Sequence, residues 1–298
     1  MKRDRNNLFK NVTKNDLGYY ELADSCRKVM NDFYENEYYQ KDMSLYHKTE
    51  YTEDEIIHRN NLYKEKECMF GKLGGVQGTL LDVGCGEGHA LEYYSNNGWQ
   101  VTGIDFSDYG IKAHHPDMID CLIKGDLIEI LQNHDKKYDF INMDNVLEHL
   151  PDPVRFLEII KNVCHENTIL CIQVPNDFSI TQMKAYDNQD IEAAFWVTDK
   201  TSEHFNYFTL DSLKKLVKAS GYVCLGQVAD WPIDFNLFNP RTNYIQNKSV
   251  GHDGHMARLT VENMLFEQSI DKTLALHETI ADLGVGRNIS VYLKLCKR

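Results

Sequence analysis

Residues 80–88 read Leu-Leu-Asp-Val-Gly-Cys-Gly-Glu-Gly, an apolar stretch that runs into a loop with glycine at every second position. Gly84, Gly86 and Gly88 allow the backbone to turn sharply and to approach a ligand closely. A helix beginning near Gly88 would point its N-terminal amides at whatever is bound. The pattern predicts a site for a nucleotide-like cofactor. The class of cofactor stays open, because dinucleotides and phosphates are bound by similar turns.

Short β-type runs alternate with helical patterns from residue 79 to about residue 230. This alternation predicts an α/β fold with a doubly wound, mostly parallel sheet of seven strands. The expected strands are 79–83, 100–104, 121–123, 140–143, 169–174, 222–227 and 289–295.

Three segments are additional to the simple alternation of strands and helices that an α/β domain requires. Residues 1–70 suit a helical cap or a mobile lid, and residues 71–298 are expected to form the cofactor-binding domain. Within that domain, 177–208 and 231–286 are insertions that follow two strands of the sheet. Because parallel strands end at the same edge, we expect both insertions to roof one pocket beside the glycine loop.

The composition limits the partners. A net charge of −13 disfavours nucleic acid, whose phosphates are bound mainly by Lys and Arg. No apolar run approaches the ~18–20 residues that span a bilayer, and no signal-peptide core follows the first residues, so a cytoplasmic protein without a membrane span is expected. The eight cysteines form no Cys-x-x-Cys pair and are expected to be reduced thiols. The oligomeric state is not predicted.

Acidic and aromatic residues follow the next two strands. Asp105 comes 21 residues after Gly84, where a carboxylate can accept two hydrogen bonds from a ribose diol, or can cap a helix. Phe106 suits either an adenine face or the core. Asp126 follows the third strand and suits either an adenine amino group or the N-cap of the next helix.

With these residues in place, the chain resembles the class I S-adenosylmethionine-dependent methyltransferases over most of 79–230. Residues 81–88, 103–107 and 125–126 are similar to the family's first, second and third motifs. The resemblance implies that S-adenosylmethionine is the cofactor and S-adenosylhomocysteine the product. An ammonium and a sulfonium suit Asp82 better than a pyrophosphate would. The implied cofactor-binding residues are Asp82, Gly84, Cys85, Gly86, Gly88, Asp105, Phe106, Asp126, Leu127 and Asp144.

Residues 142–153 resemble the Leu-Glu-His motif of the branch that holds ubiquinone-biosynthesis O-methyltransferases and many sugar methyltransferases. The resemblance places His149 at the mouth of the pocket. Some ubiquinone-pathway members carry a Glu, associated with a divalent ion, where this chain has Asn145. No metal site is therefore predicted, and Asn145 is grouped with the catalytic residues. The alternative is that Glu148 and His149 form a hydrogen-bonded pair that orders the next helix.

The run Glu-His-Phe-Asn-Tyr-Phe at 203–208 is similar to a run in surface-polysaccharide and sugar methyltransferases. Methyl transfer from a sulfonium is an in-line displacement in which the acceptor oxygen must lose a proton. A histidine titrating near neutrality fits that role, so His149 and His204 are the two candidate bases. Glu203 and Asn206 are predicted to contact the acceptor.

A locally basic stretch in the last insertion contains Arg241, His252 and His255. It could bind a phosphate, a carboxylate or a nucleotide diphosphate of the acceptor, or it could form a solvated surface.

These residues together predict O-methylation of a small polar acceptor, preferably a sugar or nucleotide-linked sugar of surface-glycan biosynthesis. A quinone precursor or a carboxylic acid is the alternative acceptor. A dinucleotide-dependent oxidoreductase and a non-catalytic ligand sensor are the alternatives from other classes.

Overall fold

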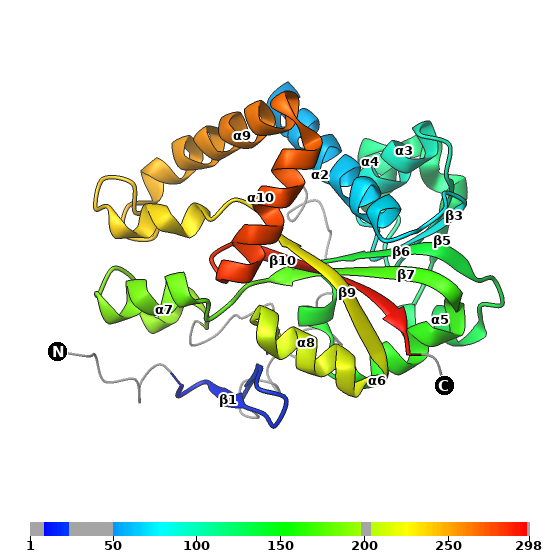
Figure 1. Ribbon diagram of the computed structural model, residues 1–298, viewed down its shortest axis with the longest axis horizontal. Helices are drawn as coiled ribbons and strands as arrows, with labels where there is room; N and C mark the ends of the chain where they lie inside the picture. Colours follow the sequence, from blue (N-terminus) through cyan, green and yellow to red (C-terminus); the bar gives the residue numbers. More distant parts are fainter. Residues whose placement is uncertain (1–8, 24–49, 198–203, 297–298) are drawn as a thin grey trace.

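The fold is built around one seven-stranded sheet, seen in a computed structural model that describes residues 9–23, 50–197 and 204–296. The strand order is β5-β4-β3-β6-β7-β10-β9, and β10 runs antiparallel to both of its neighbours (Figure 1). The predicted doubly wound, mostly parallel sheet is confirmed. The strands are β3 (Thr79–Val83), β4 (Gln100–Asp105), β5 (Leu122–Lys124), β6 (Tyr138–Asp144), β7 (Cys164–Pro175), β9 (Tyr222–Ala229) and β10 (Asn288–Leu295).

Helices cover both faces of this sheet, because successive strand side chains point to opposite sides. Leu81 packs with α6 and α8 on one face, while Leu80 packs with α2 and α3 on the other. The helices are α2 (Glu53–Lys72), α3 (His89–Asn96), α4 (Tyr109–His114), α5 (Leu127–Asn133), α6 (Pro153–Ile159), α7 (Ile180–Asp187), α8 (Leu210–Ala219), α9 (Gly251–Gln268) and α10 (Ile270–Leu283).

A second, three-stranded sheet was not predicted. It consists of β1 (Val12–Lys14), β2 (Tyr20–Leu22) and β8 (Asn206–Tyr207), with β2 paired to both others. Strands therefore occupy part of the segment 1–70, for which a helical cap or lid was expected, and α2 supplies its helix. The strands form because one face of the sheet is buried: Val12, Leu22 and Tyr207 join a separate apolar cluster.

The second insertion, 231–286, forms the long helices α9 and α10. Helix α9 packs against α2, and α10 packs against β9 (Figure 1). Gly284 ends α10 with a φ of 71°, a left-handed conformation that glycine adopts without strain. This insertion brings side chains of α9 over the carboxyl ends of the central strands. None of the described helices is both long enough and apolar enough to cross a membrane.

The close contact between α4 and the glycine loop gives a stability prediction. A β-carbon at Gly110 would come within 2.7 Å of the Gly86 carbonyl oxygen, so Gly110→Ala must displace backbone. We expect it to lower the free energy of unfolding by ~1–3 kcal/mol in urea titrations. Gly71→Ala is the matched control. It lies in α2 with no atom within 4 Å of the added carbon, and should stabilise the protein by up to ~1 kcal/mol. Equal effects of the two substitutions would rule out the contact.

Candidate active site

The loop after β3 is held in a conformation that requires glycine. Gly84, Gly86 and Gly88 have φ values of 71°, 52° and 82°. Gly88 stands at the N-cap of α3, so the loop leads directly into that helix. A β-carbon at Gly86 would meet no atom within 4 Å, which means that open space adjoins the loop at this point.

Parallel pairing of β3 with β4 and β6 gathers three carboxylates at one edge of the sheet, those of Asp82, Asp105 and Asp144. Asp105 at the end of β4 accepts hydrogen bonds from the backbone amides of Gly86 and Ser107, each at 2.9 Å. Asp82 in β3 accepts one from the Asn142 side chain at 2.7 Å. Burial raises the pKa of Asp82 to about 7. The Asp105 carboxylate therefore holds the glycine loop at Gly86 against the end of β4.

Helix α2 supplies a buried cation to this edge. The Lys66 ammonium contacts both carboxylate oxygens of Asp144 and donates to Asn142 Oδ1 at 3.0 Å. Its side chain is 5% exposed. Burial lowers the pKa of Lys66, but the neighbouring Asp144 carboxylate outweighs this effect and the net shift is upward. Lys66 is therefore charged at neutral pH and links α2 to β6.

A cavity of about 830 Å³ opens from the glycine loop and extends between α2 and α9. Its lining includes six carboxylates but only three Lys or Arg side chains. Neutral amides and hydroxyls from β6, β7 and β10 also line it. The charged lining residues are Glu55, Glu65, Asp82, Glu87, Asp144 and Asp230, with Arg59, Lys66 and Arg258.

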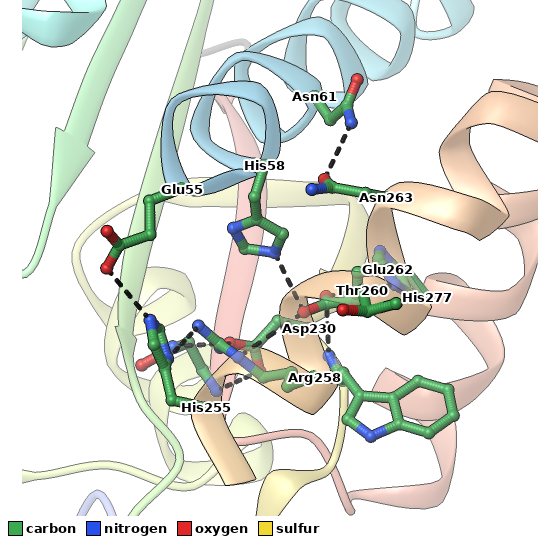
Figure 2. A network of polar contacts seen from close by, with 12 residues as sticks. Glu55, His58, Asn61, Asp230, His255, Arg258, Thr260, Glu262, Asn263 and His277 are labelled. Carbon is green, nitrogen blue, oxygen red and sulfur yellow. Dashed lines mark hydrogen bonds and ion pairs between the residues drawn. The ribbon is translucent and has the colours of Figure 1, made fainter. Parts of the chain in front are cut away.

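One wall of the cavity is a polar network between α2, α9 and α10, shown in Figure 2. Glu262 on α9 is fully buried and lies 2.9 Å from His58 Nε2 on α2. The Arg258 guanidinium lies 3.6 Å from Asp230 and 3.7 Å from Glu262. His255 reaches Glu55 at 3.5 Å. These contacts fix the position of α9 over the cavity.

The two candidate bases lie next to each other. The rings of His149 and His204 are 4.8 Å apart between centroids and nearly perpendicular. His204 Nδ1 lies 3.8 Å from Asp177, whose carboxylate lies 3.3 Å from Arg287. Burial is the largest single effect and lowers the pKa of His204, but the neighbouring Asp177 and Glu148 carboxylates together outweigh it and raise the pKa overall. Neither histidine is among the residues that line the cavity, which extends toward them as far as Asn145.

Glu148 separates this pair from the core. Its side chain is 1% exposed, and neither carboxylate oxygen has a hydrogen-bond partner within the described ranges. Burial raises its pKa to about 8. The amide of Phe205 donates to the Glu148 carbonyl oxygen at 2.8 Å, which connects the end of the first insertion to this motif.

The predicted residues separate into two groups. Seven of them line the cavity: Asp82, Gly84, Cys85, Gly86, Asp144, Asn145 and His255. Others pack around the loop without lining it, including Gly88, Asp105 and Phe106. Asp126 caps α5 by accepting from the Glu129 amide at 2.9 Å, as the alternative interpretation expected, and Leu127 packs against the core.

Three predicted acceptor contacts differ from expectation. Arg241 and His252 are exposed and do not line the cavity. Arg241 lies in the loop before α9, and α9 turns the side of His255 and Arg258 inward instead of that of His252. Asn206 is fully buried and donates to the Leu150 carbonyl oxygen at 2.7 Å, so it orders the loop after His149. Glu203 lies outside the described residues. No described residue of 177–208 lines the cavity, so only the second insertion roofs it there.

Sequence reasoning missed the contribution of α2. Tyr51, Arg59 and Lys66 line the cavity, although this region was assigned only as a cap or lid. A signal was present: Thr52 and Glu55 form a capping box that marks the start of a helix. His58, Leu62, Glu65, Lys66 and Met69 then share one helical face, and a charged residue on a buried face indicates a functional or structural partner.

Comparison with known proteins identifies a family with this organisation. Residues 55–227, more than half of the chain, match the family described as Methyltransferase domain. Among solved structures, the plantazolicin methyltransferase BpumL in complex with a triazolic desmethylPZN analog and SAH superimposes with a TM-score of 0.53. The identity is 16%, covering 92% of this chain and 96% of that one, which is a similarity of fold.

Curated relatives match over a shorter stretch. A ubiquinone biosynthesis O-methyltransferase of Saccharophagus degradans is 35% identical over 81 residues, which is 26% of this chain and 34% of that protein. The corresponding enzyme of Hydrogenovibrio crunogenus is 33% identical over 84 residues, again 26% of this chain and 35% of that protein. The chain thus spans about a third of the length of the curated relatives it matches.

The buried Glu148 carboxyl predicts a pH-dependent stability. Between its ordinary pKa of 4.5 and about 8, the group is protonated only in the folded state, so raising the pH favours unfolding across this window. We expect Glu148→Gln to flatten this dependence and to be more stable than the wild type above pH 8 by a few kcal/mol. Urea titrations at pH 5, 7 and 8.5 measure the effect. Parallel stability curves for the two proteins would contradict the burial of a carboxyl group whose oxygens have no hydrogen-bond partner among the described residues.

Proposed function

This chain belongs to the methyltransferase-domain family, and from that premise we propose that it transfers a methyl group from S-adenosylmethionine to a hydroxyl of a small polar acceptor. The family match bears out the identification of a class I S-adenosylmethionine-dependent methyltransferase, and it leaves the dinucleotide-dependent oxidoreductase without support. The observation that carries the proposal is the glycine loop, bounded by strand-end carboxylates, that opens into a polar cavity.

The residues around the loop fit the cofactor. Gly86 leaves open space, as close approach of a ligand to the backbone requires. Asp105 is held at the end of β4 by two amides, which orients its carboxylate for a ribose diol. Asp82 and Asp144 supply negative charge on the cavity side, which favours the ammonium and sulfonium of S-adenosylmethionine. When bound, the cofactor supplies the electrophilic methyl group.

The cavity walls favour a hydroxylated acceptor. Asn145, Gln173, Asn288 and Ser290 present amide and hydroxyl groups to the same space. Such groups both donate and accept hydrogen bonds, as a polyol requires. Because carboxylates outnumber Lys and Arg in the lining, a neutral sugar unit suits the described walls better than a phosphate does. Within surface-glycan biosynthesis, we therefore favour an acceptor whose sugar hydroxyl enters the cavity.

The histidine pair supports proton removal from that hydroxyl. Asp177 holds His204 and increases its basicity, which is how a carboxylate assists a catalytic imidazole. His149 packs against it edge to face. His255 lines the cavity, but burial and the nearby Arg258 lower its pKa, so it is better suited to hydrogen-bond the acceptor.

The pKa of Asp82 gives a prediction for cofactor binding. A bound ammonium favours ionised Asp82, so binding below pH 7 must release a proton from this group. We expect the affinity for S-adenosylhomocysteine to increase by up to ~10-fold for each unit by which the pH is raised toward 7, and to level off above pH 7. Calorimetric titrations at pH 5.5 to 8.5 test this. Asp82→Asn should bind more weakly and with little pH dependence; an unchanged slope would remove Asp82 from the site.

Substitution of the histidines tests the catalytic assignment. We expect His204→Ala or His149→Ala to lower kcat by ~10²–10⁴-fold, because a general base contributes this much. The affinity for S-adenosylhomocysteine should not change. His255→Ala is the comparison, and should raise KM with a smaller effect on kcat. The measurement is S-adenosylhomocysteine formation with a panel of neutral and phosphorylated sugars, quinone precursors and carboxylic acids.

Three outcomes would change the proposal. Loss of turnover in His255→Ala with normal rates in the other two variants would move the base to α9. Turnover of a quinone precursor or a carboxylic acid, but of no sugar, would replace the acceptor class. Binding of S-adenosylmethionine without turnover of any member of the panel would instead favour a ligand sensor.

A further inference from the structure

A second cluster of titratable side chains lies beside the glycine loop and has no part in the proposed methyl transfer. It consists of Glu87 in the loop, His89 at the first position of α3 and His114 at the last position of α4. One side-chain atom from each residue lies within 4.8 Å of the others. Each of the three side chains is 11% exposed. The cluster is therefore compact and largely withdrawn from solvent.

The distances in this cluster approach those around a bound metal ion. His89 Nε2 lies 2.9 Å from one carboxylate oxygen of Glu87, and His114 Nε2 lies 3.5 Å from the other. Ligand atoms around a tetrahedral zinc ion, with bonds of ~2.0–2.2 Å, are about 3.3 Å apart. The two contacts to Glu87 thus differ from this spacing by a few tenths of an ångström. The ligand nitrogens of the two histidines lie within 4.8 Å of each other and would move together to admit an ion.

Neighbouring groups orient His89 and Glu87, two of the three side chains. His89 Nδ1 is hydrogen-bonded to His115 Nε2 at 2.7 Å, and His115 Nδ1 lies 3.3 Å from Glu92. The Tyr51 hydroxyl donates to Glu87 at 2.6 Å. Histidines that bind metals commonly have their other ring nitrogen hydrogen-bonded in this way, which fixes the tautomer and the ring orientation. Arg59 lies over the Tyr51 ring at 4.7 Å, and Glu87 and Glu92 together exceed its charge.

We propose that Glu87, His89 and His114 form a binding site for a divalent transition-metal ion, with zinc as the best fit. Two imidazoles and one carboxylate are a recognised zinc ligand set, whereas Mg²⁺ and Ca²⁺ prefer oxygen ligands alone. The ion would link the glycine loop to α3 and α4. It would also stabilise the contact of Tyr51 with the loop, at the wall of the cavity that Glu87 and His89 line. This site does not depend on the identity of the acceptor.

The described residues contain one other group with metal-ligand spacing, formed by Glu148, His149 and His204. Its His204 faces Asp177, which is already paired with Arg287. A guanidinium so close opposes a second cation, and the histidine pair suits proton removal instead. An experiment on the first cluster must still distinguish the two groups.

Zinc titration of the full chain, stripped of metal, tests the site by competition with a chromophoric chelator. We expect one ion per chain in the wild type. Glu87→Gln and His114→Ala should weaken binding more than ~100-fold, and His115→Ala should weaken it by ~10–100-fold. His204→Ala tests the other cluster and His252→Ala tests an exposed histidine; both should bind as the wild type does. Mg²⁺ should not compete.

Glu87→Gln also controls for folding, because a glutamine can still accept the hydrogen bond from Tyr51. Its melting temperature without metal should match that of the wild type, and zinc should raise the melting temperature of the wild type alone. Co²⁺ should give the absorption of a tetrahedral nitrogen and oxygen site in the wild type but not in Glu87→Gln. Absence of stoichiometric zinc, or binding that persists in Glu87→Gln and disappears in His204→Ala, would overturn the proposal.

Discussion

Parallel pairing of β3 with β4 and β6 is the constraint on which the site depends. It places Asp82, Asp105 and Asp144 at one edge of the sheet, although 62 residues of chain separate the first from the last. Buried carboxylates repel one another and lose hydration, so each needs donors. The donors come from the Gly86 and Ser107 amides, from Asn142 and from Lys66. The Asp105 carboxylate thus holds the glycine loop, while Asp82 and Asp144 contribute to the negative charge of the cavity.

The polar interface between α2 and α9 also contains buried charged groups that need partners. Glu262 on α9 is a buried carboxylate whose partners are His58 on α2 and Arg258 on α9 itself. Lys66 is a second buried charge on α2, and its partner Asp144 lies on β6. Breaking such a pair leaves an uncompensated buried charge, which costs far more than the pair contributes. This interface therefore specifies one position of α9 over the cavity, and in doing so selects His255 and Arg258 as lining residues.

The seven-stranded sheet was predictable because it depends on local patterns. The same holds for the part of the site around the glycine loop and the acidic residues at the strand ends. Glycine at 84, 86 and 88 is required by positive φ angles, and an acidic residue at a strand end is recognisable from the strand alone. The three-stranded sheet and the cavity wall formed by α2 and α9 were not predictable in this way. The pairing of β2 with β8 joins residues near 20 to residues near 206, and no local pattern encodes such a partner.

By itself, the amino-acid sequence determined the sheet and the glycine loop, since strand periodicity and turn chemistry act over a few residues. The methyltransferase class came from the resemblance of three short motifs to that family. Only the tertiary structure decided which side chains face the cavity. Arg241 and His252 belong to the same basic stretch as His255, yet Arg241 lies in an exposed loop before α9, and the direction in which α9 packs leaves His252 in solvent. Packing brings Lys66 to Asp144 and brings His114 of α4 to Glu87 and His89 beside the glycine loop, contacts between residues that lie far apart along the chain.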